Sequence, residues 1–188
     1  MNLKEKIGKI IERRTVKNLK KEITKYISGN IVLDNGCGGG SFIYEKHNDK
    51  KVYGVDKRKP QIYSGIFKLA DSTKLPFKDN FFDCVISAGV IQYIKDYNKA
   101  LEEIKRVLKK EGKLIISTVN RDSLLRRLKI IGKKPKIEAG EYQIFSYKEL
   151  ENLLKKYNFR IKKKLGVDYV TMPKTLSSNS LFICQNEK

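Results

Sequence analysis

A glycine-rich segment placed directly after an apolar run is the feature of this sequence that most restricts its fold. The segment reads IVLDNGCGGGS and covers residues 31–41. Its apolar start predicts a buried strand, and clustered glycines are favourable only where the backbone bends sharply or closely approaches another group. A strand that runs through such a loop into a helix is typical of doubly wound α/β sheets, whose ligands bind beyond the carboxyl ends of the strands.

Strands and helices are expected to alternate along the rest of the chain. The apolar runs lack strict alternation, which is typical of parallel strands covered on both faces. A capping box of Ser146 and Glu149 is expected to start the last helix, and Glu111 and Gly112 to end the helix before the fifth strand. The expected strands cover residues 31–34, 51–56, 67–71, 83–87, 113–119, 160–167 and 180–184, and the expected helices cover 3–11, 16–27, 41–46, 97–108 and 147–157.

The fold class expected from this order is α/β, with a Rossmann-like, doubly wound, mostly parallel seven-stranded sheet. No helix separates the last two strands, so they are expected to form an antiparallel C-terminal hairpin at the sheet edge. The length of 188 residues favours a single domain, 1–188. Within it, residues 1–29 form a helical extension and residues 120–140 a basic insert or lid after the fifth strand.

Composition limits the class of protein. The sequence has no apolar run long enough to span a membrane and no secretory signal at its start, so a cytoplasmic location is expected. Its three cysteines are widely spaced and it has one histidine, which argues against disulfide frameworks and metal sites. The formal net charge of +20 is compatible with a polyanionic partner such as RNA, DNA or an anionic membrane surface, but also with a lysine-rich proteome.

Three aspartates near strand ends indicate the ligand. Asp34 lies at the start of the glycine loop, where its charge would repel a phosphate but suits a cationic amine. Asp56 ends the second strand, where a carboxylate can accept hydrogen bonds from both ribose hydroxyls. Asp71 ends the third strand and can accept a hydrogen bond from the adenine amine. A ligand with an amine, a ribose diol and an adenine but no phosphate is S-adenosylmethionine.

Taken together, these motifs resemble those of class I S-adenosylmethionine-dependent methyltransferases of the group similar to the ubiquinone- and menaquinone-biosynthesis enzymes. The resemblance covers about residues 30–154. It rests on VLDNGCGGG, VYGVD, LADSTKLPFKDNFFDCVIS, AGVIQYIKD, ALEEIKRVLKKEGKLIIST and FSYKELENLL.

The resemblance implies S-adenosylmethionine as cofactor and assigns a role to each part of the site. The loop after the first strand would hold the methionine portion, the second strand end the ribose, and the third strand end the adenine. The segment after the fourth strand would line the methyl group. The implied contacts are Asp34, Gly36, Cys37, Gly38, Gly40, Asp56, Lys57, Asp71, Ser72, Ser87, Ala88 and Gln92.

The methyl acceptor is the open question of the sequence. Methyl transfer needs alignment more than a catalytic side chain, and Tyr93 is a candidate only for orienting the acceptor. A small-molecule or lipid-like acceptor is favoured by the apolar residues of the insert. RNA is the alternative, because basic residues in the N-terminal helices and the insert could bind phosphates. A cofactor-binding regulatory protein without catalysis is a third hypothesis, and the sequence does not determine the oligomeric state.

Overall fold

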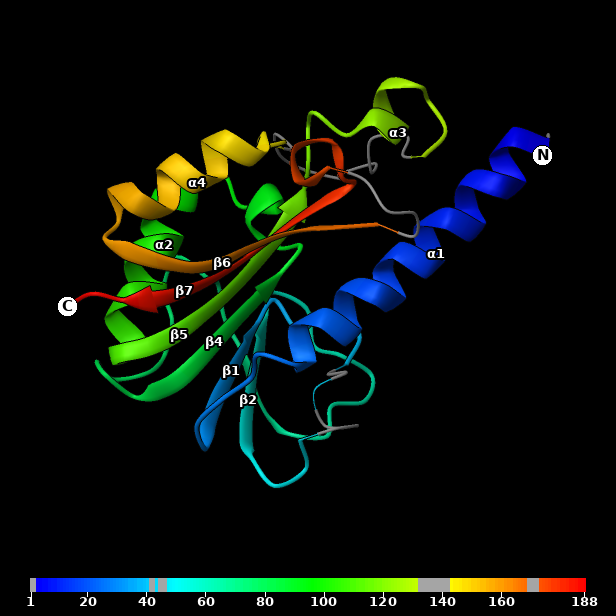
Figure 1. Ribbon diagram of the computed structural model, residues 1–188. Helices are drawn as coiled ribbons and strands as arrows, with labels where there is room; N and C mark the ends of the chain where they lie inside the picture. The colour runs from blue at the N-terminus through cyan, green and yellow to red at the C-terminus, as the bar shows by residue number, and fades with distance from the viewer. Residues whose placement is uncertain (1–2, 41–42, 44–46, 132–142, 169–172) are drawn as a thin grey trace.

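A seven-stranded sheet forms the centre of the computed structural model, which describes residues 3–40, 43, 47–131, 143–168 and 173–188 (Figure 1). The strand order is β3-β2-β1-β4-β5-β7-β6. Strands β1 to β5 pair in parallel, whereas β7 is antiparallel to both β5 and β6. The predicted fold class is therefore confirmed, with β6 as the outer strand of the C-terminal hairpin. The strands are β1 (Ile31–Asn35), β2 (Lys51–Asp56), β3 (Ile66–Leu69), β4 (Phe82–Ala88), β5 (Leu108–Val119), β6 (Phe159–Val167) and β7 (Asn179–Asn186).

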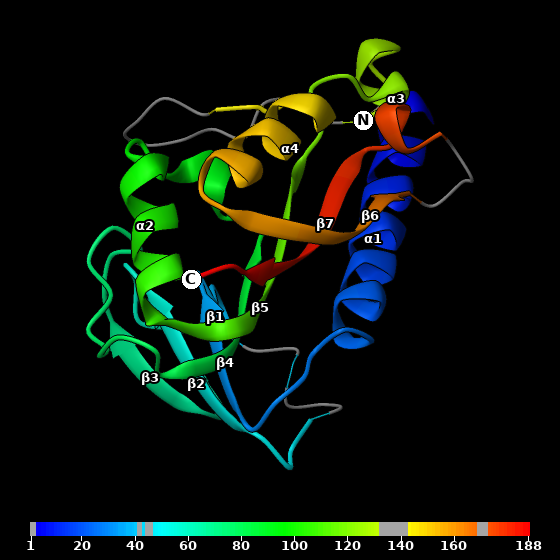
Figure 2. The same cartoon turned by 60° about the vertical axis from the view of Figure 1, so that its left-hand side comes forward.

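Helices cover both faces of this sheet. In Figure 2 the helix α1 lies on one side of the sheet, and α2 and α4 lie on the other. Each face buries its own cluster of apolar side chains, one containing Leu33, Leu101 and Phe182 and the other containing Ile23, Val32 and Ile183. Burying a side chain of this size stabilises a fold by about 1.5–3 kcal/mol. The helices are α1 (Leu3–Thr24), α2 (Tyr97–Val107), α3 (Leu124–Arg127) and α4 (Tyr147–Lys156), with short 3₁₀ turns η1 (Ile91–Tyr93) and η2 (Lys174–Leu176).

The N-terminal residues form one long helix, and the prediction of two separate helices is wrong. Helix α1 runs without interruption over 22 residues, through the position where a break was expected. Thr15 and Val16 are β-branched, which weakens a helix slightly but does not end one. Thr15 is buried, so packing against the sheet holds this turn in place.

The junction between α2 and β5 also differs from the prediction. The helix ends at Val107, and the next residue, Leu108, already has an extended backbone and begins β5. Glu111 and Gly112 therefore lie inside the strand range and do not stop the helix. Glu111 has a positive φ of 60°, and the pairing of β4 with β5 shifts register nearby, so this end of β5 is irregular.

Other predicted elements are close to those observed. The capping box of Ser146 and Glu149 is present at the start of α4. Strand β3 ends at Leu69, so Asp71 lies in the turn beyond it and not in the strand. The helix expected over residues 41–46 lies outside the described residues except for Ile43. None of the described helices is long and apolar enough to cross a membrane.

An arginine on α2 holds the segment that connects β3 to β4. The Arg106 guanidinium donates hydrogen bonds to the carbonyl oxygens of Leu75 and Phe77, at 3.0 and 2.7 Å. It also pairs with Glu103 at 2.7 Å and with Asp79 at 2.8 Å. The hydrogen bond from Arg106 lowers the pKa of Glu103, against the opposing effect of burial. One side chain thus fixes several turns of a segment that has little regular structure.

We expect Arg106→Gln to lower the free energy of unfolding by about 2 kcal/mol at neutral pH, because buried carbonyls lose a charged donor. The Glu103 pKa lies below its ordinary value of 4.5 in the folded state. The stabilisation from the pairing of Glu103 with Arg106 is therefore complete above the ordinary pKa of 4.5, and it is lost as the pH falls through the folded pKa. Urea unfolding of the unchanged protein and of Arg106→Gln should show a difference in the free energy of unfolding that becomes smaller as the pH falls.

Arg160→Gln, which removes an exposed ion pair with Glu187, is the control and should change stability little. The hydrogen bonds to the Leu75 and Phe77 carbonyl oxygens do not titrate, so part of the difference should remain in acid. A difference that does not narrow at all would contradict the contribution of Glu103.

Candidate functional site

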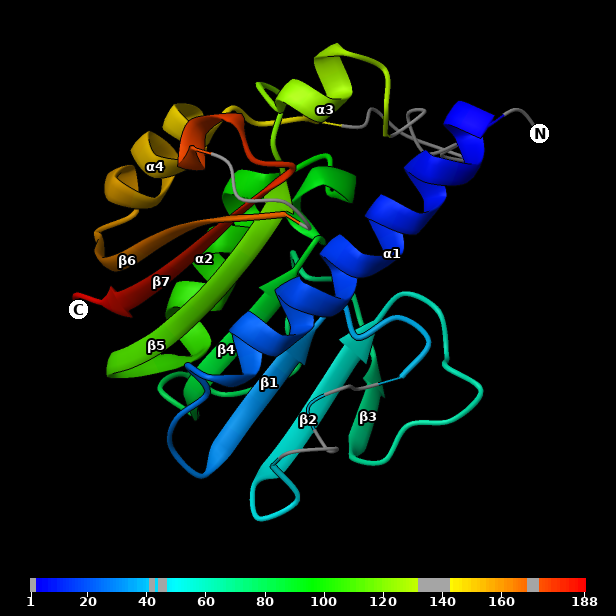
Figure 3. The same cartoon turned by 45° about the vertical axis from the view of Figure 1, so that its right-hand side comes forward.

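The glycine loop after β1 is fixed to the end of β2. The backbone N–H groups of Gly36 and Cys37 both donate to the carbonyl oxygen of Val55, at 2.8 and 3.0 Å. The N–H of Gly38 donates to Oδ2 of Asp56 at 2.9 Å. The loop is therefore shaped by its neighbour in the sheet, which places its turn beyond the carboxyl ends of the parallel strands (Figure 3).

Asp56 is the link between this loop and the next one. Besides Gly38, its carboxylate accepts a hydrogen bond from the N–H of Arg58, at 3.0 Å to Oδ1. An ionised carboxylate has about four lone-pair sites, so two such bonds leave capacity for a ligand hydroxyl. The position predicted for ribose contact thus also organises the backbone on both sides of it.

Two polar residues end β1 in a buried environment. The side chain of Asp34 is almost completely buried, and Asn35 has no exposed surface. Oδ1 of Asn35 accepts a hydrogen bond from the Ser72 hydroxyl at 2.9 Å, while its Nδ2 has no partner among the described residues. Asn35 is not among the residues predicted from sequence, although a second polar residue at the end of an apolar strand is a usable signal. This contact joins the glycine loop to the turn after β3.

The turn after β3 holds the carboxylate of Asp71. Its Oδ2 pairs with Nζ of Lys57 at 2.7 Å, and its Oδ1 accepts from the N–H of Thr73 at 2.9 Å. Burial would raise the pKa of Asp71, but the hydrogen bonds from Lys57 and Thr73 outweigh it and the pKa lies below its usual value. Lys57, chosen from sequence as a neighbour of the ribose position, therefore lies against the residue expected to contact adenine.

The segment after β4 contributes one buried hydroxyl and one bracing side chain. Ser87 is buried, and its Oγ has no hydrogen-bond partner among the described residues. Gln92 is also buried, and its Oε1 accepts from Oγ1 of Thr118 at 2.6 Å. The amide oxygen of Gln92 is thus used to tie η1 to β5. Ala88 is partly buried, and Tyr93 is half exposed.

Cys37 lies inside the loop and is not set up as a nucleophile. Its side chain is buried, and burial, followed by the nearby Asp34 and Asp56 charges, raises the pKa of the thiol to about 12. The reactive thiolate is therefore scarce at neutral pH. The Cys37 side chain is therefore a packing residue of the loop.

The described candidates come from adjacent strand ends. The register pairs Asp34 with Ile86 and Asn35 with Val55, so the ends of β1, β2 and β4 lie side by side. A Cβ added at Gly38 or Gly39 would meet no atom within 4 Å, so a ligand can approach the loop backbone there. The carboxylates accept hydrogen bonds, the loop backbone is open, and the Ser87 hydroxyl has no partner within the described ranges. Such a set of groups suits a ligand with an amine, a diol and an adenine and without a phosphate.

Comparisons with known proteins identify the family. A methyltransferase-domain family model matches residues 33–116. A crystal structure of the PH0226 protein from Pyrococcus horikoshii is 26% identical, with a TM-score of 0.73 over 94% of this chain and 91% of that one. A crystal structure of an S-adenosylmethionine-dependent methyltransferase from Thermotoga maritima is 21% identical, with a TM-score of 0.72 over 95% of this chain and 92% of that one. The chain belongs to the class I S-adenosylmethionine-dependent methyltransferases. The cofactor of this methyltransferase is therefore S-adenosylmethionine.

Two relatives of the methyltransferase are uncharacterized proteins of Methanocaldococcus jannaschii. One is 41% identical over 109 residues, which are 51% of this chain and 44% of the relative. The other is 32% identical over 156 residues, which are 81% of this chain and 74% of the relative. The chain thus spans less than half the length of the first relative and about three quarters of the second.

Proposed function

We propose that this methyltransferase transfers the methyl group of S-adenosylmethionine to a small or lipid-like acceptor. The observation that carries the choice of acceptor is the position and character of α3. It lies beyond the carboxyl end of β5 (Figure 1). Leu124 at its start and Leu128 directly after it are 36% and 53% exposed. Aliphatic side chains beside the ligand edge of the sheet suit an apolar acceptor better than a phosphate backbone.

The proposed cofactor contacts follow the strand ends. Asp34 and the backbone of residues 36–40 would receive the methionine amine and carboxylate, and Asp56 the ribose hydroxyls. Asp71 would accept from adenine alongside Lys57, since a carboxylate has lone pairs for both. Ser72 would support this turn through Asn35, because its hydroxyl already donates there.

The chemistry asks little of any one side chain. S-adenosylmethionine supplies an activated methyl group, and the chain's residues have to align the acceptor with it and exclude water. Ser87, Ala88 and Gln92 would border the methyl side, and the Gln92 bond to Thr118 keeps that border rigid. Tyr93 would orient the acceptor at the surface.

The test is transfer of radiolabelled methyl from S-adenosylmethionine into a fractionated cell extract. We expect the label in the small-molecule or solvent-extractable lipid fraction. Label that remains with RNA and is released by ribonuclease would overturn the proposed acceptor and favour RNA. Cofactor binding without transfer to any fraction would instead favour a regulatory protein. The Asp56→Ala variant serves as the background control.

A further inference from the structure

The first half of α1 and the short helix α3 lie together at one corner of the molecule. In Figures 1 and 3 both lie beyond the carboxyl end of β5, toward the N-terminus. Helix α1 is in close contact with the segment that follows α3, because a Cβ added at Gly8 would lie 2.2 Å from the carbonyl oxygen of Ile130. Leu125 and Ile131 are buried and hold this segment in place. The outer surfaces of both elements therefore form one corner of the surface.

This corner exposes aliphatic side chains. Ile7 and Ile10 of α1 are 45% and 51% exposed, and Leu124 of α3 and Leu128 directly after it are 36% and 53% exposed. Single exposed aliphatic residues are common on protein surfaces, but several at one corner mark an interaction site. Ile7 and Ile10 lie on the side of α1 that points away from Gly8 and from the segment after α3, so we call these two isoleucines alone the aliphatic corner.

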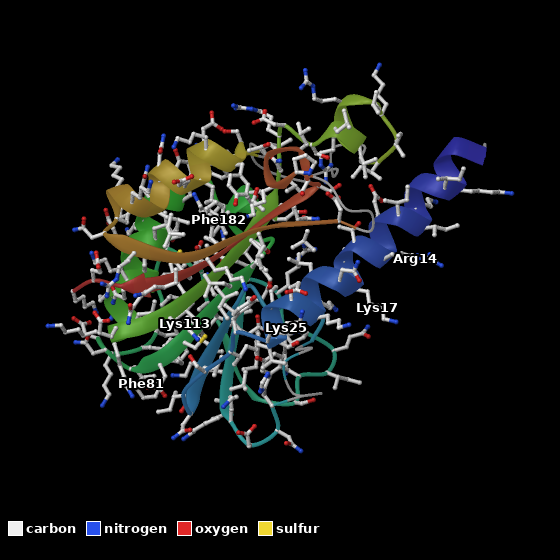
Figure 4. The ribbon with its side chains drawn as sticks, viewed as in Figure 1. Arg14, Lys17, Lys25, Phe81, Lys113 and Phe182 are labelled. Atoms are coloured by element: carbon white, nitrogen blue, oxygen red, sulfur yellow. The ribbon has the colours of Figure 1, made fainter. Side chains whose placement is uncertain are left out.

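Basic residues continue the same stripe of α1. From Ile7 and Ile10, steps of three or four residues lead to Arg14, Lys17 and Lys21, which places all five on one side of the helix. All five are exposed, and Figure 4 shows Arg14 and Lys17 directed away from the sheet. The sequence of α1 contains eight basic and three acidic residues, and that of α3 is LLRR. The corner is thus apolar at its tip and basic along its side.

We propose that the aliphatic corner and the basic stripe of α1 dock this protein on an anionic lipid surface. Aliphatic side chains gain free energy when they enter the boundary between headgroups and acyl chains. Lysine and arginine side chains at the same depth are attracted to anionic headgroups. The ligand edge of the sheet would then face the membrane, from which a lipid-like acceptor could be taken directly.

Two other occupants explain the observations less well. RNA would satisfy the basic stripe, but the sequences of α1 and α3 contain no aromatic residue on which a base could stack. Burying Ile7 and Ile10 against RNA would also gain little. A second copy of the chain would bury the aliphatic corner, but it would also bring together two helices that each contain eight basic and three acidic residues, and their like charges would repel.

The test is flotation of the full-length protein with vesicles of phosphatidylcholine, with and without phosphatidylglycerol. We expect binding only to the vesicles that contain phosphatidylglycerol. The double variant Ile7→Gln/Ile10→Gln keeps the charge and the helix, and should lower the partition into these vesicles roughly tenfold because two aliphatic side chains no longer enter the lipid. The binding needs no methyl acceptor, so its outcome is separate from that of the proposed methyl transfer.

The matched control is Ile66→Gln, which removes an isoleucine of similar exposure, 41%, on β3 at the other side of the sheet. Its partition should equal that of the unchanged protein. A thermal melt and cofactor binding establish that each variant is folded. Failure of the unchanged protein to float with anionic vesicles, or equal partition of the double variant, would overturn the proposal. Preferential capture by bulk transfer RNA that the double variant retains would overturn it in favour of RNA.

Discussion

Replacing Asp56 by alanine is expected to weaken S-adenosylmethionine binding about a hundredfold, which corresponds to about 3 kcal/mol. The variant would lose the proposed ribose contact and also the acceptor that holds the N–H of Gly38 at 2.9 Å. The two losses act on adjacent parts of the ligand, because Asp56 is the proposed ribose contact and Gly38 belongs to the loop proposed to receive the methionine portion. Isothermal titration calorimetry with S-adenosylmethionine and with S-adenosylhomocysteine measures the effect.

Two further variants separate these contributions. Asp56→Asn retains one carbonyl oxygen as an acceptor, so its affinity should fall between those of the unchanged protein and the alanine variant. Asp49→Ala removes a carboxylate before the amino end of β2, where it only pairs with Lys50 at 3.5 Å and is 69% exposed. This control should bind the cofactor normally. An unchanged affinity for Asp56→Ala would remove Asp56 from the site.

The succession of strands and helices along the chain could be predicted because it depends on local patterns. Apolar runs that end in Asp34 or Asp56 predict both a strand and the position of its carboxyl end. In a parallel sheet these carboxyl ends lie close together. Boundaries were less predictable where tertiary contacts decide them. The β5 strand starts at Leu108 because that residue pairs with Phe82 across the sheet, and nothing near Leu108 in the sequence specifies this partner.

The candidate site shows the same division between local and long-range information. Acidic residues at strand ends were visible in the sequence, whereas their partners were not. The contacts of Ser72 with Asn35 and of Gln92 with Thr118 join residues far apart in the chain. Lys57 was chosen as a neighbour of Asp56 in sequence, but its side chain reaches Asp71. Single residues in the sequence indicate the chemistry of the site. Only the fold shows which of these residues form hydrogen bonds with one another.

The second large effect is expected for Gly36→Ala, which should lower the free energy of unfolding by about 2–5 kcal/mol and displace the cofactor loop. Gly36 has a φ of 76°, a conformation that costs an L-residue about 1–2 kcal/mol. An added Cβ would also lie 2.4 Å from Cγ2 and 2.6 Å from Cγ1 of Val90. Relieving such an overlap costs a further 1–3 kcal/mol or so, by shifting either the loop or η1.

The neighbouring glycine separates backbone strain from steric overlap. Gly38 has a φ of 57°, but a Cβ there would meet nothing within 4 Å. Gly38→Ala should therefore cost only the backbone term, about 1–2 kcal/mol. Val90→Ala removes both Cγ atoms, so Gly36→Ala made in that background should cost about as little as Gly38→Ala. Urea unfolding of the unchanged protein, Gly36→Ala, Val90→Ala and the double variant forms a double-mutant cycle. Its interaction free energy measures the overlap between the added Cβ and Val90. A cycle with no interaction would show that Val90 does not constrain the loop. A double variant that is less destabilised than the sum of the two single variants would instead show that the segment after β4, on the proposed methyl side, packs against the glycine loop and sets its shape.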